Sequence, residues 1–107
     1  MREIKFRALD AGTNEWLYFT LQDLIVGNAS HNLRLKNWCR FTGLLDKNNK
    51  EIYEGDIISV KGHTHADTFT STVAYRRGGF VFDDKGYYIG DYKEYMLEVI
   101  GNVYEKG

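Results

Sequence analysis

Apolar and polar residues alternate over short stretches of the chain, which is the period of β-strands with one buried face. The first stretch covers residues 2–9, where apolar side chains face one way and charged ones, Arg7 among them, face the other. The turn-forming residues 10–14 separate it from the aromatic run 15–19, so the two stretches are expected to pair as a hairpin. Leu and Ile side chains at helical spacing before Gly27 then predict a helix of fewer than two turns.

Further along the chain, short apolar runs alternate with clusters of Gly, Asn and Asp, which is typical of a small β-barrel or sandwich. The strands expected here lie near residues 37–45, 51–60, 67–76, 80–83 and 96–103. Residues 87–95 are compatible with a helical turn, which the sequence does not decide. We therefore expect a mainly β fold in which a small barrel follows an N-terminal hairpin and a short helix. Residues 1–36 would pack on this barrel or on a neighbouring subunit, and residues 37–107 would form it.

The chain of 107 residues has the length of one domain, and its eight Tyr and six Phe favour sheet over helix. The net charge is −1, but residues 1–50 carry eight Lys/Arg and five Asp/Glu, whereas residues 51–107 carry six and ten. A dedicated nucleic-acid binder would usually have a larger basic excess. Opposite charge on the two halves suits self-association.

A single cysteine, Cys39, excludes an internal disulfide and favours a reducing compartment. We interpret it as a small buried hydrophobe rather than an activated thiol, because no feature marks a His or a helix N-terminus beside it. The chain starts with alternating charged and apolar residues instead of the apolar region of a signal peptide. No run approaches the ~18 apolar residues of a transmembrane helix. We therefore expect a cytoplasmic protein without membrane contacts.

Three acidic residues, Glu51, Glu54 and Asp56, lie close together between two apolar runs. As catalytic groups they would have to form a carboxylate pair in a cleft, with one pKa raised by burial. As structural groups they would flank a bend, in which Gly55 takes a positive φ and the Asp56 carboxylate accepts hydrogen bonds from backbone amides. We favour the bend, because acidic residues beside glycine are common in turns and small curled barrels need such kinks.

The most suggestive motif for chemistry contains His63, His65 and Asp67. In an extended chain the two histidines would project to the same side, and two imidazoles with a carboxylate could hold a metal ion. Alternate histidines in a glycine-led loop are more often solvated, so we expect no metal and no cofactor. A metal-dependent enzyme stays the least favoured hypothesis.

A second motif interleaves cations with a tryptophan, namely Arg34, Lys36, Trp38 and Arg40. Such residues could follow a single-stranded nucleic acid and stack a base. We favour the alternative, an edge strand protected by outward cations with Trp38 in the core. The usual signatures of hydrolases, nucleotide-binding proteins and redox enzymes do not occur in the sequence, which lowers the expectation of an enzyme.

Three segments in this order resemble a known family: FRALD, FTGLLDKNNKEIYEGDII and EVIGNVYE. The chain resembles the YopX-like family of small phage and prophage proteins over nearly its whole length. The central motif is specific, since it keeps in register Thr42-Gly43-Leu44, Asp46-Lys47 and Ile52-Tyr53-Glu54-Gly55-Asp56. Departures are local: the family often has an aromatic residue where Leu9 stands, a glycine where Asn49 stands, and a few more residues after Glu105.

The resemblance implies a mostly β protein with an SH3-like barrel at its C-terminal end and a setting in phage-carrying bacteria. It implies no established activity and no catalytic residues. We therefore expect a non-enzymatic binding or assembly module that contacts an unknown phage or host protein. A homo-oligomer is also expected, because the N-terminal segment is too short to bury its own apolar face. Structural roles in turns are expected for Gly43, Gly55, Asp56 and Gly101.

Overall fold

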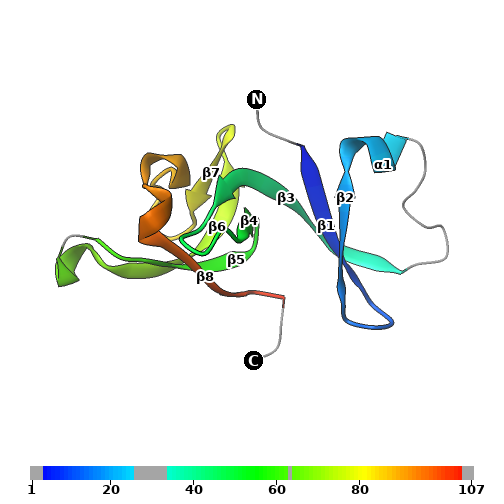
Figure 1. Ribbon diagram of the computed structural model, residues 1–107, viewed down its shortest axis with the longest axis horizontal. Helices are drawn as coiled ribbons and strands as arrows, with labels where there is room; N and C mark the ends of the chain where they lie inside the picture. The colour runs from blue at the N-terminus through cyan, green and yellow to red at the C-terminus, as the bar shows by residue number, and fades with distance from the viewer. Residues whose placement is uncertain (1–3, 26–33, 63, 105–107) are drawn as a thin grey trace.

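The computed structural model describes residues 4–25, 34–62 and 64–104. Within these residues the protein is mainly β, as predicted, with two antiparallel four-stranded sheets and one short α-helix (Figure 1). No helix in these parts of the chain is long and apolar enough to cross a membrane.

The first sheet has the strand order β2-β1-β3-β4. Its strands are β1 (Lys5–Asp10), β2 (Trp16–Thr20), β3 (Leu35–Leu45) and β4 (Glu51–Tyr53). Helix α1 (Leu21–Ile25) follows β2 directly. Its start is capped reciprocally, because Thr20 Oγ1 accepts the backbone N–H of Asp23 at 3.1 Å and the Asp23 carboxylate accepts that of Thr20 at 2.9 Å. The predicted hairpin and short helix are both present.

The second sheet has the strand order β7-β6-β5-β8. Its strands are β5 (Asp56–Val60), β6 (Phe69–Arg76), β7 (Gly79–Phe82) and β8 (Leu97–Asn102). Three short 3-10 helices lie in the connections: η1 (His65–Asp67), η2 (Ile89–Asp91) and η3 (Glu94–Met96). The stretch expected as one strand over 51–60 is thus divided in two by a turn, and the strand expected from residue 67 starts at Phe69.

Two local features lie at glycines that the sequence analysis placed in a turn or a bulge. The β6–β7 hairpin turns through Arg77 and Gly78, whose φ values of 53° and 79° are both positive, as a type I′ turn requires. Between β5 and β8, Ile57 pairs with Gly101 and Ile58 with Val99, so the register shifts by one residue next to Gly101.

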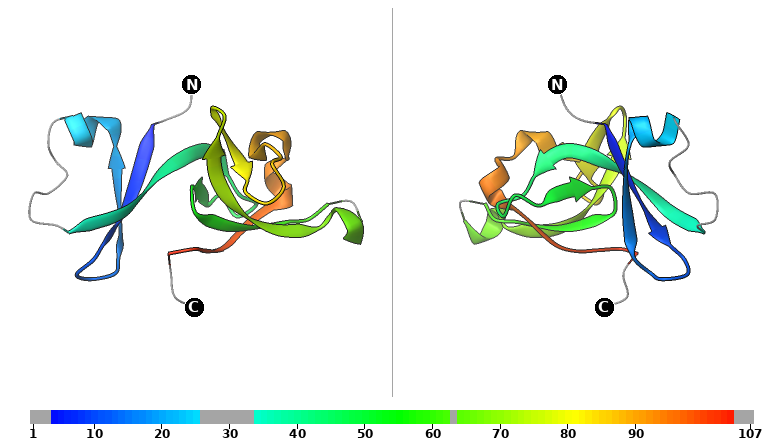
Figure 2. Two further views of the ribbon diagram at one scale, coloured as in Figure 1. Left: turned by 180° about the vertical axis from the view of Figure 1, so that it is seen from behind. Right: turned by 45° about the vertical axis from the view of Figure 1, so that its right-hand side comes forward.

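Strand β3 connects the N-terminal hairpin to the C-terminal part of the molecule. Its first half pairs with β1 and its end pairs with β4, and the register shifts in both pairings. Asn37 and Gly43, with φ values of 56° and 86°, allow the chain to bend within the strand. Figures 1 and 2 show β3 arching from the β1–β2 hairpin, at one end of the molecule, to the β5–β8 sheet at the other. The boundary expected between residues 36 and 37 therefore falls inside a shared strand.

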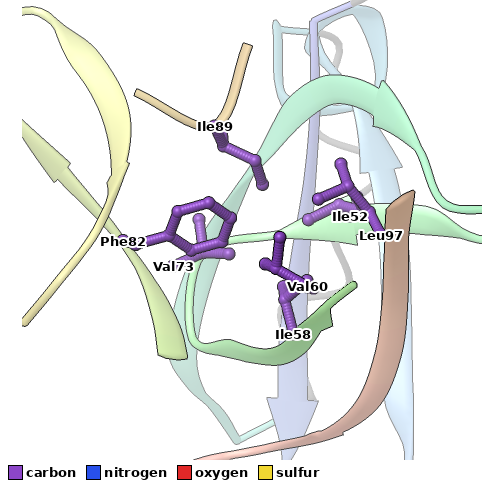
Figure 3. Packing of buried hydrophobic residues seen from close by; sticks show 7 residues of the cluster. All are labelled: Ile52, Ile58, Val60, Val73, Phe82, Ile89 and Leu97. Atoms are coloured by element: carbon purple, nitrogen blue, oxygen red, sulfur yellow. The ribbon is translucent and has the colours of Figure 1, made fainter. Parts of the chain in front are cut away.

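The main core lies in the C-terminal part. Seven side chains, each at most 2% exposed, come from β4, β5, β6, β7, η2 and β8 (Figure 3): Ile52, Ile58, Val60, Val73, Phe82, Ile89 and Leu97. Full burial of such a side chain stabilises the fold by about 1.5–3 kcal/mol. The core therefore joins β4 of the first sheet to the four strands of the second sheet.

Strand β1 differs from its prediction. From Arg7 to Asp10 every residue is buried, whereas Ile4, expected on the buried face, is 56% exposed. The expectation that Arg7 faces solvent is wrong, because the turn between β4 and β5 packs over that face of β1. This packing creates the polar centre described next.

Candidate functional site

An ion pair joins the two sheets in the interior of the protein. Nη2 of Arg7 in β1 lies 2.6 Å from Oδ1 of Asp56 in β5, and the two side chains are 5% and 1% exposed. Removing two charges from water is costly, and their attraction offsets this only when the geometry is good and other groups compensate for the lost water. The surroundings of the Arg7 guanidinium provide part of this compensation, while its buried Nε–H has no hydrogen-bond partner among the described residues.

Aromatic rings surround the Arg7 guanidinium. Its central carbon lies 4.3 Å from the ring centroid of Trp16 and 4.8 Å from that of Tyr53. The Trp16 ring in turn meets the ring of Tyr104 edge-on, with 6.2 Å between centroids. A guanidinium is weakly hydrated and stacks well on aromatic faces, so these rings replace part of its water shell. Residues from β1, β2, β4 and the segment after β8 therefore meet around one cation.

Asp56 also closes the turn between β4 and β5. Its second carboxylate oxygen accepts the backbone N–H of Tyr53 at 2.8 Å, and Gly55 within the turn has a φ of 84°. Burial raises the pKa of the Asp56 carboxyl, while the Arg7 guanidinium and the Tyr53 N–H favour its charged form. Both carboxylate oxygens are thus engaged inside the protein, where no outside substrate reaches them. Asp56 holds the bend and neutralises Arg7.

The other two acidic residues of the cluster bind partners on β1 and β3. Glu51 pairs with Lys5 and accepts the Tyr53 hydroxyl at 2.9 Å. Glu54 accepts both the backbone N–H and the Nε–H of Arg40 at 2.8 Å. Burial, and then the Glu51 carboxylate, raises the pKa of Tyr53, so its hydroxyl stays a hydrogen-bond donor. The acidic cluster therefore fastens β1 and β3 to the bend.

A groove opens on the surface between the start of β1, the middle of β3 and the β6–β7 hairpin. It consists of two adjoining hollows of ≈ 310 and ≈ 340 Å³ that share Thr42, Tyr75 and Phe80. The first is also lined by Ile4, Lys5, Phe6, Arg40, Phe41 and Gly43, and the second by Leu44, Gly78, Gly79, Tyr88, Ile89 and Gly90. We call this surface the β3 groove. A concave surface lined mainly by apolar and aromatic side chains is suited to receiving a side chain of a ligand.

Arg40 and Tyr75 are held in fixed positions at the groove. The type I′ turn sets Tyr75 directly opposite Phe80, and their ring centroids are 5.0 Å apart at 70°. The Arg40 guanidinium lies 4.0 Å from the Tyr75 ring centroid and is bound by both oxygens of Glu54. The hydrogen bonds that the Arg40 guanidinium donates to Glu54 raise the pKa of Arg40. The groove thus presents a stacked arginine and tyrosine, two residue types that are enriched in interface hot spots.

The four residues considered for nucleic-acid binding fall into two groups. All four are exposed, but Arg40 is also paired with Glu54 at the groove, which sets it apart from Arg34, Lys36 and Trp38. Trp38 packs against Phe19 with 5.4 Å between ring centroids but is 45% exposed, so the prediction that it lies in the core is wrong. The edge-strand prediction fits the pairing better: among the described residues, positions 35–40 of β3 pair with β1, whereas β4 pairs with the end of the strand from Phe41 onward. Local pattern alone did not tell which side of this bent strand is covered.

The part of the histidine motif that the structure describes is not in the extended conformation that the metal hypothesis assumed. His65–Asp67 forms the 3-10 helix η1 instead of an extended chain, and the Asp67 carboxylate accepts the Thr64 hydroxyl at 3.1 Å. His63 lies outside the described residues. Within those that are described, no three His, Cys, Asp or Glu side chains are grouped so that they could hold a metal ion.

Cys39 is a small buried residue, as interpreted from the sequence. It lies opposite Arg7 in the β1–β3 pairing, is 1% exposed, and donates its S–H to the carbonyl of Asn37 at 3.1 Å. Burial raises the pKa of the thiol, against the opposing effect of Arg7. A thiol with a raised pKa and no access to solvent is a poor nucleophile.

Three important residues were not identified from the sequence, namely Arg7, Tyr75 and Phe80. Arg7 alternates with apolar residues just as a surface cation would, so no local signal marks it. Tyr75 and Phe80 could have been found, because they flank the predicted turn Arg77-Gly78-Gly79 and a two-residue turn sets such positions opposite each other.

These features define a small two-sheet β protein, organised inside around a buried arginine and carrying an aromatic groove on its surface. The model of the YopX protein family matches residues 28–107, which is most of the chain. The chain therefore belongs to the YopX protein family, as the resemblance of its motifs implied. No curated protein matches the sequence.

Proposed function

We propose that this protein is a non-enzymatic binding or assembly module of a phage or prophage, acting through protein–protein contacts in the bacterial cytoplasm. Its β3 groove receives an apolar side chain of a phage or host protein. The observation that carries the proposal is the pair of Arg40 and Tyr75, stacked at the groove with Tyr75 39% exposed. Family membership supports the setting and assigns no activity.

The side chains that line the groove are held in place by contacts within the protein, which favours binding. A surface whose residues are fixed before the partner arrives loses less conformational freedom on association. Glu54 fixes Arg40, the β6–β7 register fixes Tyr75 opposite Phe80, and the buried ion pair fixes β1 against β5. The partner therefore meets a formed site rather than one that must be ordered.

Capture of partners on a tagged copy in prophage-carrying cells tests the proposal. We expect Tyr75→Glu to lose a phage or host protein that the unchanged protein retains, because a charge replaces the ring at the groove. Tyr95→Glu is the matched control, since Tyr95 lies in η3, is 70% exposed and does not line the groove. If Tyr75→Glu retained the same partner proteins as the unchanged protein, the groove would not be the binding surface.

Self-association is the second part of the proposal. Helix α1 has no buried residue, with Leu21 42% and Ile25 74% exposed, so it offers an apolar face to a second copy. Light scattering across micromolar concentrations is expected to show an oligomer that the double change of Leu21 and Ile25 to Ser dissociates. A monomer at every concentration would end this part.

Binding of single-stranded nucleic acid is a second candidate function. The exposure of Trp38, together with Arg34 and Lys36 near it in the sequence, favours it, because an exposed part of an aromatic ring can stack a base. Fluorescence anisotropy with short oligonucleotides is the test. Binding that salt and Trp38→Ala weaken steeply would support it, and no binding at low salt would exclude it.

For residues 37–107 we propose the SH3-like barrel that the family resemblance implied. Two backbone hydrogen bonds support it by linking the first sheet's turns to the second sheet: Lys47 N–H to Leu97 O at 2.8 Å and Gly55 N–H to Val73 O at 2.9 Å. An experimental structure in which such bonds continue around the strands would support closure into a barrel. Two sheets with open edges between them would contradict it.

A further inference from the structure

A hollow of ≈ 460 Å³ lies beside η1 and shares no lining residue with the β3 groove. The residues that matter for its chemistry are three aromatic side chains, a methionine and two charged groups: Phe69, Tyr87, Tyr92, Met96, Asp67 and Lys85. Close packing of Gly62 against Asp67 shapes one wall, since a Cβ added at Gly62 would lie 2.3 Å from that of Asp67. We call this hollow the aromatic pocket.

In the aromatic pocket the Phe69 ring stands at steep angles to the rings of Tyr87 and Tyr92. The Phe69 ring centroid lies 6.3 Å from that of Tyr87, at an interplanar angle of 68°, and 6.0 Å from that of Tyr92, at 75°. Phe69 and Tyr92 are partly buried and packed on the core, whereas Tyr87 is 53% exposed at the entrance. A box of rings at such angles can present several negative π-faces to a cation between them.

A cation already lies at this box. Nζ of Lys85 is 5.3 Å from the Phe69 ring centroid, within the range of a cation–π contact. A carboxylate acts in the same direction, because Asp67 lines the pocket. The pKa of Tyr92 is raised first by burial, then by the neighbouring Tyr87, and then by Asp91 and Asp67. The rings and the Asp67 carboxylate therefore both favour a positive group.

We propose that the aromatic pocket binds an alkylammonium group, with its charge over the rings of Phe69, Tyr87 and Tyr92, and that Lys85 is the internal competitor for this place. The ammonium can come from a lysine side chain of another protein or from a free quaternary amine, because both present the same charge to the rings. This site is separate from the β3 groove, so it stands or falls independently of the proposed protein-binding function.

The direct test is a titration of the full 107-residue chain with choline, in which binding is monitored through the amide chemical shifts. The matched probe is 3,3-dimethylbutan-1-ol, which has the shape of choline without its charge. We expect saturable shifts around the pocket, with dissociation constants in the millimolar range, and about tenfold weaker binding of the neutral probe, which lacks the cation–π attraction. Equal affinity for the two probes would overturn the proposal, because it would show an apolar hollow without preference for charge.

Three variants locate the site. Tyr87→Leu keeps an apolar side chain but removes a ring, and is expected to weaken choline binding severalfold, whereas Tyr95→Leu, which changes an exposed ring outside the pocket, leaves it unchanged. Lys85→Met removes the competing ammonium and is expected to tighten binding severalfold. Unchanged choline binding in Tyr87→Leu would overturn the proposal. It would also be overturned if neither choline nor the lysine probe described next saturated the unchanged protein or Lys85→Met up to ~100 mM.

A second titration with Nα-acetyl-lysine methylamide distinguishes the two sources. Tighter binding of this probe than of choline would assign the pocket to a lysine of a partner protein, and the reverse order would assign it to a quaternary amine. Either result supports the alkylammonium site, while failure of both probes rejects it. In every variant, amide chemical shifts outside the pocket that match those of the unchanged protein would show that the fold is intact.

Discussion

Arg7 and Asp56, which lie 49 positions apart in the sequence, form a buried ion pair. The pair connects the N-terminal hairpin to the sheet that contains the main core, and the same aspartate closes the turn at Gly55. The two parts of the chain are thus joined by this buried charge–charge contact as well as by the shared strand β3.

Removal of one partner of this pair is expected to destabilise the fold strongly. Arg7→Met leaves the Asp56 carboxylate buried without its cation, which costs about 3–5 kcal/mol in free energy of unfolding. The double variant Arg7→Met with Asp56→Asn should be more stable than the sum of the single effects predicts, because no charge is left unpaired. Urea denaturation of the four proteins measures the difference.

An exposed ion pair provides the control. Arg76 and Asp83 also form an ion pair, but their side chains are 57% and 47% exposed. Arg76→Met is therefore expected to change the free energy of unfolding by at most about 1 kcal/mol. Similar costs for Arg7→Met and Arg76→Met would show that the interior pair does not join the two parts of the fold.

The strands and turns could be predicted because their signals are local. Alternation marked the β1–β2 hairpin, and glycine with its neighbours marked the β6–β7 turn and the bend at Gly55. The start of β6 was placed too early, because the pattern of Thr and Phe does not show that His65–Asp67 closes a 3-10 turn before it. Element type follows from near neighbours, while the end of an element depends on what packs beside it.

The candidate sites depended on contacts between distant segments, which the sequence did not reveal. Arg7 has the spacing of a surface cation, and only the arrival of the β4–β5 turn on that face buries it. Trp38 is the opposite case: its size and neighbours favoured the core, yet the bend at Asn37 leaves it 45% exposed. The aromatic pocket combines residues from η1, β6 and the 85–96 segment, and no spacing rule brings these together.

Cys39 is expected to resist modification in the folded protein. The thiol is 1% exposed and burial raises its pKa, so both access and thiolate fraction are low. Reaction with a thiol-specific reagent near pH 8 should be on the order of 100-fold slower than after unfolding in urea, where the pKa returns to its ordinary range. Equal rates with and without urea would show that β1 and β3 open readily around this residue.

Asp46 holds the loop between β3 and β4 against β8. One of its carboxylate oxygens accepts the N–H groups of Asn48 and Lys50 at 2.8 and 2.9 Å, and the other accepts that of Val99 at 2.9 Å. Burial alone raises the pKa of this carboxyl, but the three N–H groups outweigh it, and the pKa lies below its ordinary value of 3.8. The ionised form is therefore the one that the fold favours.

A pH dependence follows for Asp46→Asn. Because the pKa is lower in the folded than in the unfolded state, the carboxylate stabilises the fold above about pH 4, and this contribution is lost as the pH falls through the folded-state value. The variant should be less stable by about 1.5–3 kcal/mol at pH 7, and the difference should shrink below about pH 4. Urea denaturation between pH 7 and pH 3 tests this, with the exposed Asp91→Asn as control. A difference that stays constant down to pH 3 would contradict the role of the charge.

Gly55, in the β4–β5 turn, is expected to tolerate replacement poorly. Its φ of 84° lies in the left-handed region, and a Cβ there would come within 2.6 Å of Cε2 of Tyr104. Gly55→Ala should therefore destabilise the protein by about 1–3 kcal/mol, whereas Gly90→Ala, which meets no atom within 4 Å, should be nearly neutral. Repeating Gly55→Ala in a Tyr104→Ala background separates the two causes. If most of the cost remains, backbone strain dominates, and if it disappears, the close approach of the Tyr104 ring does. A neutral Gly55→Ala in both backgrounds would show that the bend does not need a left-handed residue at this position.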